Sequence, residues 1–221
     1  MTRVVLVGTG TGIGKTHAGV ALVSALATAG VQVAGLKPIE SGVSTGPTDA
    51  SALAAAGSFH VKQAPYTFAA PVSPHLAARR EGVFIDLPRV QAWVDAHAAA
   101  VVVVETAGAL LSPLGPGLTN LGLARALRPD VLILVAPDRL GVLHEVASAM
   151  HVLRTLAADL PSPLLLLQPP AVPDESTGTN AAELALLGIH PAPLAFPRAE
   201  PTAAETLSAA RALLVAARVL S

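Results

Sequence analysis

A glycine-rich loop near the beginning of the chain has the residue types that bind nucleotide phosphates. It reads Gly8-Thr9-Gly10-Thr11-Gly12-Ile13-Gly14-Lys15-Thr16, after a short apolar run and before a segment with a helical pattern. Glycines let successive backbone N–H groups turn toward an anion, while Lys15 can reach the terminal phosphates and Thr16 can ligate Mg²⁺. The strict pattern requires glycine where this chain has Thr9, so the loop is one residue longer. The order of strand, loop, Gly-Lys-Thr and helix argues against a loop without function.

Two acidic residues follow predicted elements at places suited to a metal ion. Glu105 comes directly after the apolar run Val101–Val104, where an ionised carboxylate needs a cation or good hydrogen-bond donors. Asp49 opens a predicted helix, so its simplest role is to cap that helix. Thr48 can act as the cap instead, which would leave Asp49 to face the phosphates and hold Mg²⁺.

A lysine also lies at the end of a predicted strand. Lys37 follows the apolar run of residues 31–36 and precedes Pro38. A solvent-exposed lysine is the simple alternative, but the phosphate loop follows another strand of the same sheet, so we favour a role at the ligand. Phosphoryl transfer is catalysed mostly by positioning and charge neutralisation. The parts for a magnesium-bound triphosphate are therefore present in Lys15, Thr16, Asp49 and Glu105.

Apolar runs alternate with helical patterns along the chain, which predicts an α/β fold with a doubly wound, mainly parallel sheet and helices on both faces. We expect a single P-loop α/β domain over residues 1–221. The expected strands are Val4–Val7, Val31–Leu36, Val101–Val104, Val131–Ala136, Leu164–Leu167 and a short one near Leu194. The expected helices are Lys15–Thr28, Asp49–Ala56, Leu87–His97, Asn120–Leu127, Val142–Ala158, Ala181–Leu187 and Ala203–Val219. Loops at the carboxyl ends of the strands are the expected ligand sites.

Composition narrows the class of protein. The net charge is −1 with 14 Lys and Arg residues, so we expect no nucleic-acid partner and no membrane partner. Cysteine is absent, which favours a reducing compartment, and we expect a cytoplasmic protein. Residues 16–36 carry no Asp, Glu, Lys or Arg, yet Gly30 divides them into a buried helix and a buried strand. The first apolar run ends after four residues, too early for a signal peptide.

Several motifs together resemble the dethiobiotin synthetase family, whose members close a cyclic urea with ATP during biotin synthesis. Residues 8–16 are similar to that family's loop, including its additional residue. Lys37-Pro38-Ile39-Glu40-Ser41-Gly42 resembles the family's Lys-Pro-x-x-Ser-Gly segment, and Thr48-Asp49-Ala50 resembles its Ser-Asp-Ala. Pro71-Val72-Ser73-Pro74-His75 followed by Glu81-Gly82 resembles another signature, although by itself it reads as a surface turn.

The resemblance implies a reaction and a set of site residues. In the family, diaminopelargonate (7,8-diaminononanoate) and CO₂ form a carbamate, ATP phosphorylates it, and the second amine displaces phosphate. The resemblance implies catalytic roles for Lys37, Lys15, Thr11 and Ser41, with Mg²⁺ held by Thr16, Asp49 and Glu105. It implies nucleotide binding by Gly12, Ile13, Gly14, Lys15, Thr16, His17, Asp49, Glu105, Gly108, Gln168, Pro197, Arg198 and Ala199. It implies substrate binding by Thr11, Lys37, Ser41, Gly108, Gly141, Val142 and His144, across a homodimer interface.

The chain departs from the family pattern at a few positions. Thr106 and Ala109 stand where the family has glycines after its strand-end glutamate. His144 replaces an asparagine at the helix start that binds the substrate's carboxylate tail, and Gln168 stands where asparagine often reads adenine. We therefore expect ATP as the co-substrate, and another nucleoside triphosphate remains an alternative.

The residues fit other functions less well. His144-Glu145 begins a zinc-protease motif, but its second histidine would fall at Ser148, and the other histidines have no metal-ligand spacing. A regulatory partitioning or septum-positioning ATPase is the alternative function. Such proteins usually carry a second lysine where this chain has Gly10, and they need a basic or amphipathic attachment surface. A family member that binds nucleotide without turnover is a third possibility, which the retained lysines and carboxylates argue against.

Overall fold

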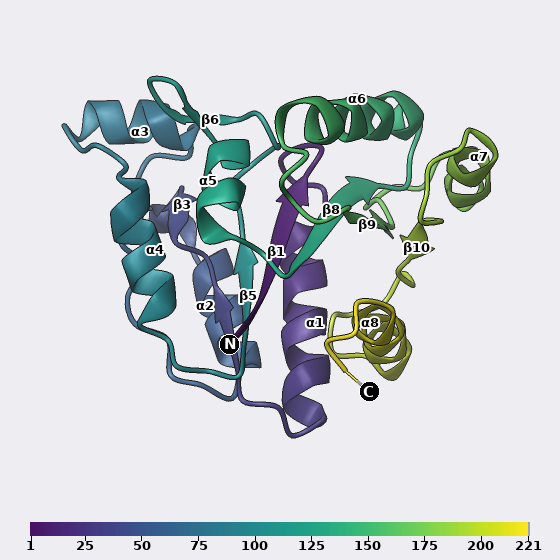
Figure 1. The fold of residues 1–221 in the computed structure, drawn as a ribbon, viewed down its shortest axis with the longest axis horizontal. Coiled ribbons are helices and arrows are strands. Elements are labelled where there is room, and N and C mark those ends of the chain that lie inside the picture. The colour runs from purple at the N-terminus through teal and green to yellow at the C-terminus, as the bar shows by residue number, and fades with distance from the viewer. Residues whose placement is uncertain (221) are drawn as a thin grey trace.

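The computed structural model describes residues 1–220, which contain a six-stranded sheet in the order β10-β9-β8-β1-β5-β2 (Figure 1). All neighbouring strands run parallel. The strands are β1 (Thr2–Gly8), β2 (Val33–Leu36), β5 (Val101–Glu105), β8 (Val131–Pro137), β9 (Leu164–Gln168) and β10 (Leu194–Ala195). Strands β5 and β2 lie on one side of β1. After β5 the chain crosses to the other side of β1, where β8, β9 and β10 lie. Ligands of doubly wound sheets bind beside such a reversal, at the carboxyl ends of the strands.

Helices connect these strands and lie on both faces of the sheet (Figure 1). They are α1 (Lys15–Thr28), α2 (Asp49–Ala56), α3 (Pro74–Arg80), α4 (Leu87–Asp95), α5 (Asn120–Leu127), α6 (Val142–Leu156), α7 (Asn180–Leu186) and α8 (Ala204–Ala216). A 3₁₀ turn spans Val43–Thr45. Short strands β3 (Ile39–Ser41) and β4 (Tyr66–Phe68) pair in parallel, and β6 (Pro113–Gly115) pairs antiparallel with β7 (Leu118–Thr119).

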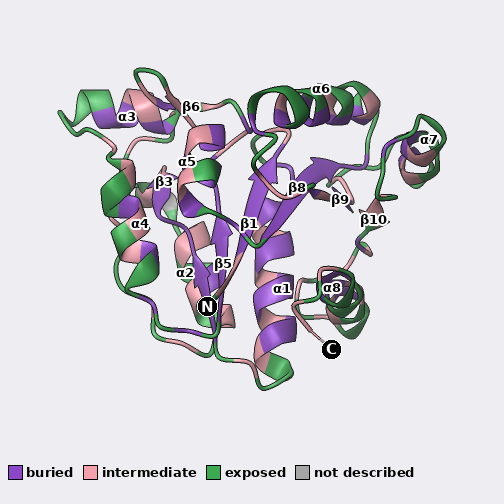
Figure 2. Cartoon of the chain, in the orientation of Figure 1, coloured by how far each residue is buried: buried purple, intermediate pink, exposed green. Residues whose placement is uncertain are grey.

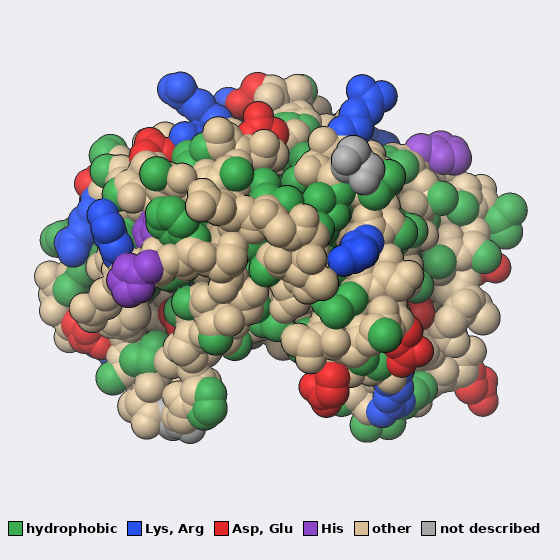
Figure 3. Space-filling model, turned by 90° about the horizontal axis from the view of Figure 1, so that it is seen from below, with side chains coloured by type: hydrophobic (Ala, Val, Ile, Leu, Met, Phe, Trp, Pro, Cys, Tyr) green, Lys and Arg blue, Asp and Glu red, His purple; other side chains and the backbone are tan. Residues whose placement is uncertain are grey.

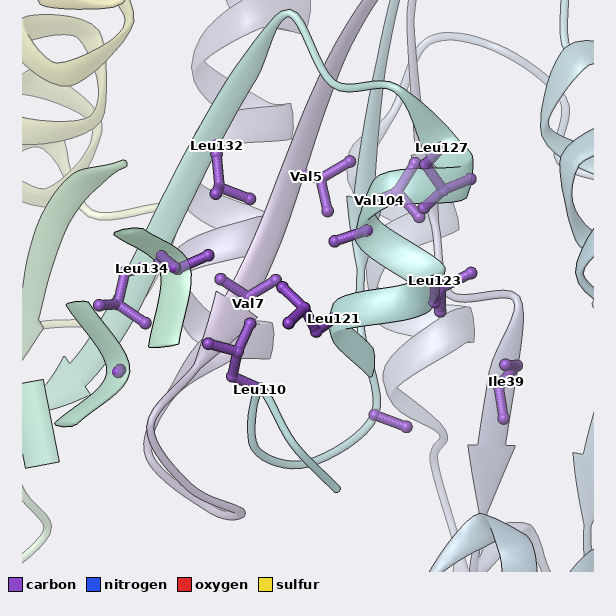
Figure 4. Packing of buried hydrophobic residues seen from close by; sticks show 14 of the residues in the cluster. Val5, Val7, Ile39, Val104, Leu110, Leu121, Leu123, Leu127, Leu132 and Leu134 are labelled. Carbon is purple, nitrogen blue, oxygen red and sulfur yellow. The ribbon is translucent and has the colours of Figure 1, made fainter. Parts of the chain in front are cut away.

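The core has two parts, one on each face of the sheet. Alternate residues of β1 point to opposite faces, so Val4 and Leu6 pack with α1 and α8 while Val5 and Val7 pack with α5 and α6. Figure 4 shows side chains of β1 and β8 beside those of α5 in the second part. Figure 2 shows buried residues concentrated in the sheet and on the helix surfaces that face it. This packing holds the strand ends, and the loops after them, in fixed relation.

The predicted fold class is confirmed, and the predicted bounds of α1, α2 and α5 agree with the structure. Strand β2 begins two residues later than predicted, because the Val31 N–H donates to Leu26 O and so closes the end of α1. Helix α3 has no counterpart among the expected helices. Pro74 occupies its first turn, where proline is favourable because no intrahelical N–H is needed there.

Two features of the structure bear on whether the protein could attach to a membrane or to a nucleic acid. None of the helices in residues 1–220 is both long and apolar enough to cross a membrane. Figure 3 shows the face at which the central strands begin, opposite to the candidate site. On that face Lys and Arg side chains lie interspersed with Asp and Glu side chains rather than gathered by sign.

Candidate active site

The phosphate loop leaves β1 and enters α1 with the backbone geometry of an anion cradle. Gly12 and Gly14 have φ values of 69° and 89°, a region that favours glycine, and Gly14 immediately precedes α1. Lys15 folds back over the loop, and its Nζ donates to Gly10 O across 2.8 Å. A Cβ on Gly8 would lie 2.9 Å from the Lys15 side chain, so glycine leaves the room that this lysine occupies.

The Lys15 ammonium is held in an environment that disfavours its charge. The pKa of Lys15 is lowered from 10.5 to about 8, chiefly by burial; Glu105 and Asp49 oppose this shift and the nearby Lys37 adds to it. An incoming triphosphate would supply negative charge where the free protein offers too little. The loop is therefore electrostatically prepared for a polyanion.

Four side chains from different elements converge next to the loop. Lys37 Nζ donates to Glu105 Oε1 across 2.7 Å and also donates to Asp49 Oδ2. The Thr16 hydroxyl donates to the same Glu105 Oε1 across 3.1 Å. Lys37 and Glu105 are 7% and 2% exposed, so this ion pair is buried, whereas Asp49 is 46% exposed. The structure thus brings Thr16, Lys37, Asp49 and Glu105 together at the carboxyl edge of the sheet.

The two members of the buried pair have opposed electrostatic influences. Burial by itself would lower the pKa of Lys37, but the charges of Glu105 and Asp49 and their hydrogen bonds raise it above its ordinary value. Burial raises the pKa of Glu105, and Lys37 opposes that shift. Lys37 is therefore a cation held between two carboxylates.

The residues around Glu105 fit a divalent cation bound together with phosphates. Within the part of the chain that the structure describes, the buried Glu105 Oε2 has no hydrogen-bond partner, so it is a carboxylate oxygen without a donor. The Thr16 hydroxyl and the Asp49 carboxylate add hard oxygen ligands close by. No group of three or more His, Asp or Glu side chains that could hold a metal occurs in residues 1–220. Mg²⁺ would thus take its remaining ligands from phosphates and water, as it commonly does.

A pocket of about 410 Å³ opens beside Lys37. Thr11, Lys37, Ser41 and Gly108 line it, so four of the predicted substrate residues share one cavity. Gly108 has a φ of 85°, and a Cβ there would lie 2.9 Å from Ser112 Oγ and 3.4 Å from Thr11 Oγ1. The remaining wall comes from Glu40, Asp49, Pro71, Val72, Ser73, Pro74, Ala107 and Ser112. The loop before α3 therefore forms part of this pocket.

Further residues predicted to bind the nucleotide lie around the start of α1. His17 Nε2 donates to Ala199 O across 2.8 Å, which attaches the segment Pro197–Ala199 to α1. Arg198 donates to Ala171 O. Gln168 is buried against Gly14, and its Nε2 has no hydrogen-bond partner among residues 1–220. Buried donors are nearly always paired, so this unpaired amide beside the phosphate loop is a candidate donor to a nucleoside base.

The residues predicted to bind the substrate tail are not among those that line the pocket beside Lys37. Gly141 and His144 are exposed at the start of α6, whereas the Val142 side chain is buried and its N–H donates to Arg139 O. Gly141, Val142 and His144 do not line the pocket beside Lys37. Within one chain, this group therefore lies outside the pocket that the other predicted substrate residues share.

Two residues at the site have roles that the sequence analysis missed. Glu40 accepts hydrogen bonds from Asp49 N across 2.7 Å and from Ala50 N across 3.2 Å, and so fixes the start of α2 together with the Thr48 cap. Asn120 Nδ2 donates to Ala109 O across 2.8 Å and to Ala107 O, which pins the loop after Glu105. The signal for Glu40 was its place in the Lys37–Gly42 segment, and nothing in the sequence singled out Asn120.

Several known proteins are similar to this chain in sequence or in fold. The family described as an AAA domain matches residues 2–163. A protein of Anaeromyxobacter dehalogenans (strain 2CP-C), named ATP-dependent dethiobiotin synthetase, is 40% identical over 222 residues, with 98% of both chains covered. The fold is similar to a ParA family ATPase from Chlorobium tepidum (TM-score 0.56, 16% identity, 98% and 92% covered). It is also similar to a MinC:MinD cell division complex from Aquifex aeolicus (TM-score 0.60, 12% identity, 97% and 96% covered).

Proposed function

Because this chain belongs to the dethiobiotin synthetase family, we propose that it converts 7,8-diaminononanoate, CO₂ and ATP into dethiobiotin, ADP and phosphate. The protein is an ATP-dependent ligase, and the ring it closes is a cyclic urea. The observation that carries this reaction is the position of Lys37. It lines the pocket beside the phosphate loop and is held by two carboxylates at the same time.

Lys37 is suited to stabilise the anionic intermediates. An ammonium has three N–H donors, and the contacts with Asp49 and Glu105 use two of them. The third donor is available to a carbamate oxygen in the pocket. One substrate amine attacks CO₂ and loses a proton to give a carbamate, whose oxygen then attacks the γ-phosphorus of ATP and releases ADP. The second amine attacks the carbamoyl carbon, releases phosphate and loses a proton, which leaves the cyclic urea.

The phosphate loop performs the other half of the task. Lys15 would neutralise the β- and γ-phosphates, and Thr16, Asp49 and Glu105 would hold Mg²⁺. When bound, Mg²⁺ supplies positive charge to the triphosphate, which lowers the barrier to attack by an anionic nucleophile. Loop glycines point backbone donors at the phosphates. The protein residues therefore position and neutralise, and none of them needs to form a covalent bond with the substrate.

The pocket would bind the amine end of the diamine, and the start of α6 would bind its carboxylate tail. Thr11 and Ser41 line the pocket and have hydroxyl groups that can orient the amines or the carbamate. The carboxylate tail would bind at Gly141–His144, where helix N–H groups favour an anion. Since that group lies outside the pocket within one chain, we propose that the partner chain of a homodimer supplies it.

The direct test is conversion of diaminononanoate and bicarbonate by the purified protein, with product mass and phosphate release measured for ATP and CTP in parallel. Formation of dethiobiotin with ATP supports the whole proposal, and preference for CTP would revise only the nucleotide. Nucleotide hydrolysis with the diamine unchanged would contradict it. The fold similarity to the ParA and MinD proteins, at 12–16% identity, concerns architecture and does not support a partitioning role.

A further inference from the structure

Glu145 joins the phosphate loop to α6, a contact that the proposed function does not use. The Thr9 hydroxyl donates to Glu145 Oε2 across 2.8 Å. Arg139 Nη2 donates to the other carboxylate oxygen across 2.9 Å. Thr9 lies in the loop, whereas Glu145 lies in the first turn of α6. One carboxylate therefore connects two segments that are far apart in the sequence.

Thr9 stands where the strict loop pattern has glycine, yet its backbone does not require glycine. Within the loop as the structure describes it, positive φ values occur at Gly12 and Gly14 and not at Thr9. The Thr9 N–H donates to Val135 O across 3.0 Å, in continuation of the pairing between β1 and β8. The position can therefore carry a side chain, and its hydroxyl provides an attachment point that glycine lacks.

The attachment leads to the phosphate-binding ammonium in two steps. Thr9 is the chain neighbour of Gly10, and the Gly10 carbonyl accepts the hydrogen bond from Lys15 Nζ. The orientation of Thr9 thus influences where this carbonyl holds the ammonium. A hydrogen bond to a carboxylate is stronger than one between neutral groups. The Arg139 and Glu145 side chains are 46% and 25% exposed, so solvent screens their ion pair, and we expect it to contribute little stability.

We propose that Glu145 is a positioning residue for the phosphate loop. Its carboxylate holds Thr9, and through Gly10 it holds Lys15, in the geometry that receives a nucleoside triphosphate. This inference rests only on nucleotide binding by the loop and not on the identity of the acceptor. Glu145 does not act on the substrate itself, so its removal weakens nucleotide binding through the loop.

The test is isothermal titration of the whole protein with ATP and Mg²⁺ in the absence of diamine. We expect Glu145→Ala and Thr9→Val each to weaken ATP binding about tenfold, because both remove one charge-assisted hydrogen bond. The double variant is expected to bind no more weakly than either single variant, since the same bond is lost. Glu145→Gln keeps an acceptor oxygen and should bind nearly as the original protein does. Arg139→Ala removes the exposed ion pair and a hydrogen bond to the neighbouring Leu140 O but leaves the bond between Thr9 and Glu145, so it is the matched control.

Three results would overturn the proposal. They are unchanged ATP affinity in Glu145→Ala and Thr9→Val, losses that multiply in the double variant, and a loss in Glu145→Gln equal to that in Glu145→Ala. Thr9→Val replaces a hydroxyl by a methyl group of similar shape, so the test stands even where Glu145→Ala does not fold. Expected ATP affinities together with absent ring closure would count against the ligase reaction and not against the role of Glu145.

Discussion

Lys37 Nζ lies 2.7 Å from Glu105 Oε1, and both side chains are almost completely buried. Each of them neutralises a charge that would otherwise be costly in this environment. Removing one partner of such a pair leaves an uncompensated buried charge, which commonly costs about 3–5 kcal/mol. A variant at Lys37 or Glu105 should therefore change both turnover and stability, so both must be measured.

Replacing Lys37 by glutamine should abolish ring closure while largely sparing ATP binding. The variant loses the cation that we assign to the carbamate, and loss of one such electrostatic group lowers turnover by about 10²–10³-fold. Product formation measured by mass and ATP affinity measured by calorimetry check the two parts. Unchanged turnover would remove Lys37 from the mechanism.

The double variant Lys37→Gln, Glu105→Gln separates catalysis from stability. It removes both charges, whereas Lys37→Gln alone leaves an unpaired buried carboxylate. The thermal unfolding temperature should therefore return toward that of the original protein. Ring closure should stay absent. Recovered activity in the double variant would show that the single variant fails through misfolding rather than through loss of the cation.

Glu105→Gln should raise the Mg²⁺ concentration needed for half-maximal activity by about tenfold or more, because a neutral amide replaces an anionic oxygen ligand. Turnover should fall at every Mg²⁺ concentration. Activity measured across a Mg²⁺ series is the check, with Asp159→Asn, an exposed carboxylate outside the site, as the control. An unchanged Mg²⁺ requirement would mean that Glu105 does not hold the metal.

Nucleotide binding should take up a proton above about pH 8, since burial sets the pKa of Lys15 to about 8 in the free protein. Below that pH Lys15 is already charged, whereas above it the triphosphate must restore the charge, and affinity falls as the pH rises. Calorimetry in two buffers of different ionisation enthalpy, at about pH 7 and about pH 9, measures the uptake. Lys15→Arg, which stays charged, should show none. Equal uptake by that variant would assign the proton to another group.

The strand ends explain how much of the site could be predicted. Lys37 and Glu105 directly follow apolar runs, and Lys15 follows one through the glycine-rich loop. Parallel strands bring their carboxyl ends to one edge, so the convergence of these residues follows from the pattern alone. Thr48 was one of two candidate caps for α2, and the structure has it as the cap. The direct contact of Lys37 with Asp49 was not predicted. It depends on the position of α2 relative to β2, which no local sequence pattern predicts.

Other parts depend on contacts between segments distant in sequence. Glu40 caps α2 only because β3 passes beside it, and β3 is three residues long, too short for an alternating pattern. Helix α3 has seven residues and begins at a proline, in a segment that also reads as a turn. The bond between Thr9 and Glu145 joins a loop to a helix and has no signal in either segment.

Asn120 should be intolerant of aspartate although the two side chains have nearly the same shape. Its Nδ2 donates to the carbonyl oxygens of Ala107 and Ala109, so Asn120→Asp places carboxylate oxygens against two acceptors in a buried position. Asn120→Ala only removes this donor. Ala109 O still accepts from Ser112 N, whereas Ala107 O loses its side-chain donor, which costs about 1–3 kcal/mol for a buried group.

We therefore expect Asn120→Asp to unfold at a lower temperature than Asn120→Ala near neutral pH, where the introduced carboxylate tends to ionise. Protonation of that carboxylate restores one donor, so the difference between the two variants should narrow as the pH falls. In Asn120→Ala, the loop that carries Gly108 loses its anchor. The KM for the diamine should consequently rise more than the KM for ATP, because Ala107 and Gly108 line the pocket beside Lys37. Thermal unfolding across a pH series and steady-state kinetics with each substrate varied in turn measure both effects. Equal stability of the two variants at every pH would mean that Asn120 does not donate to this loop.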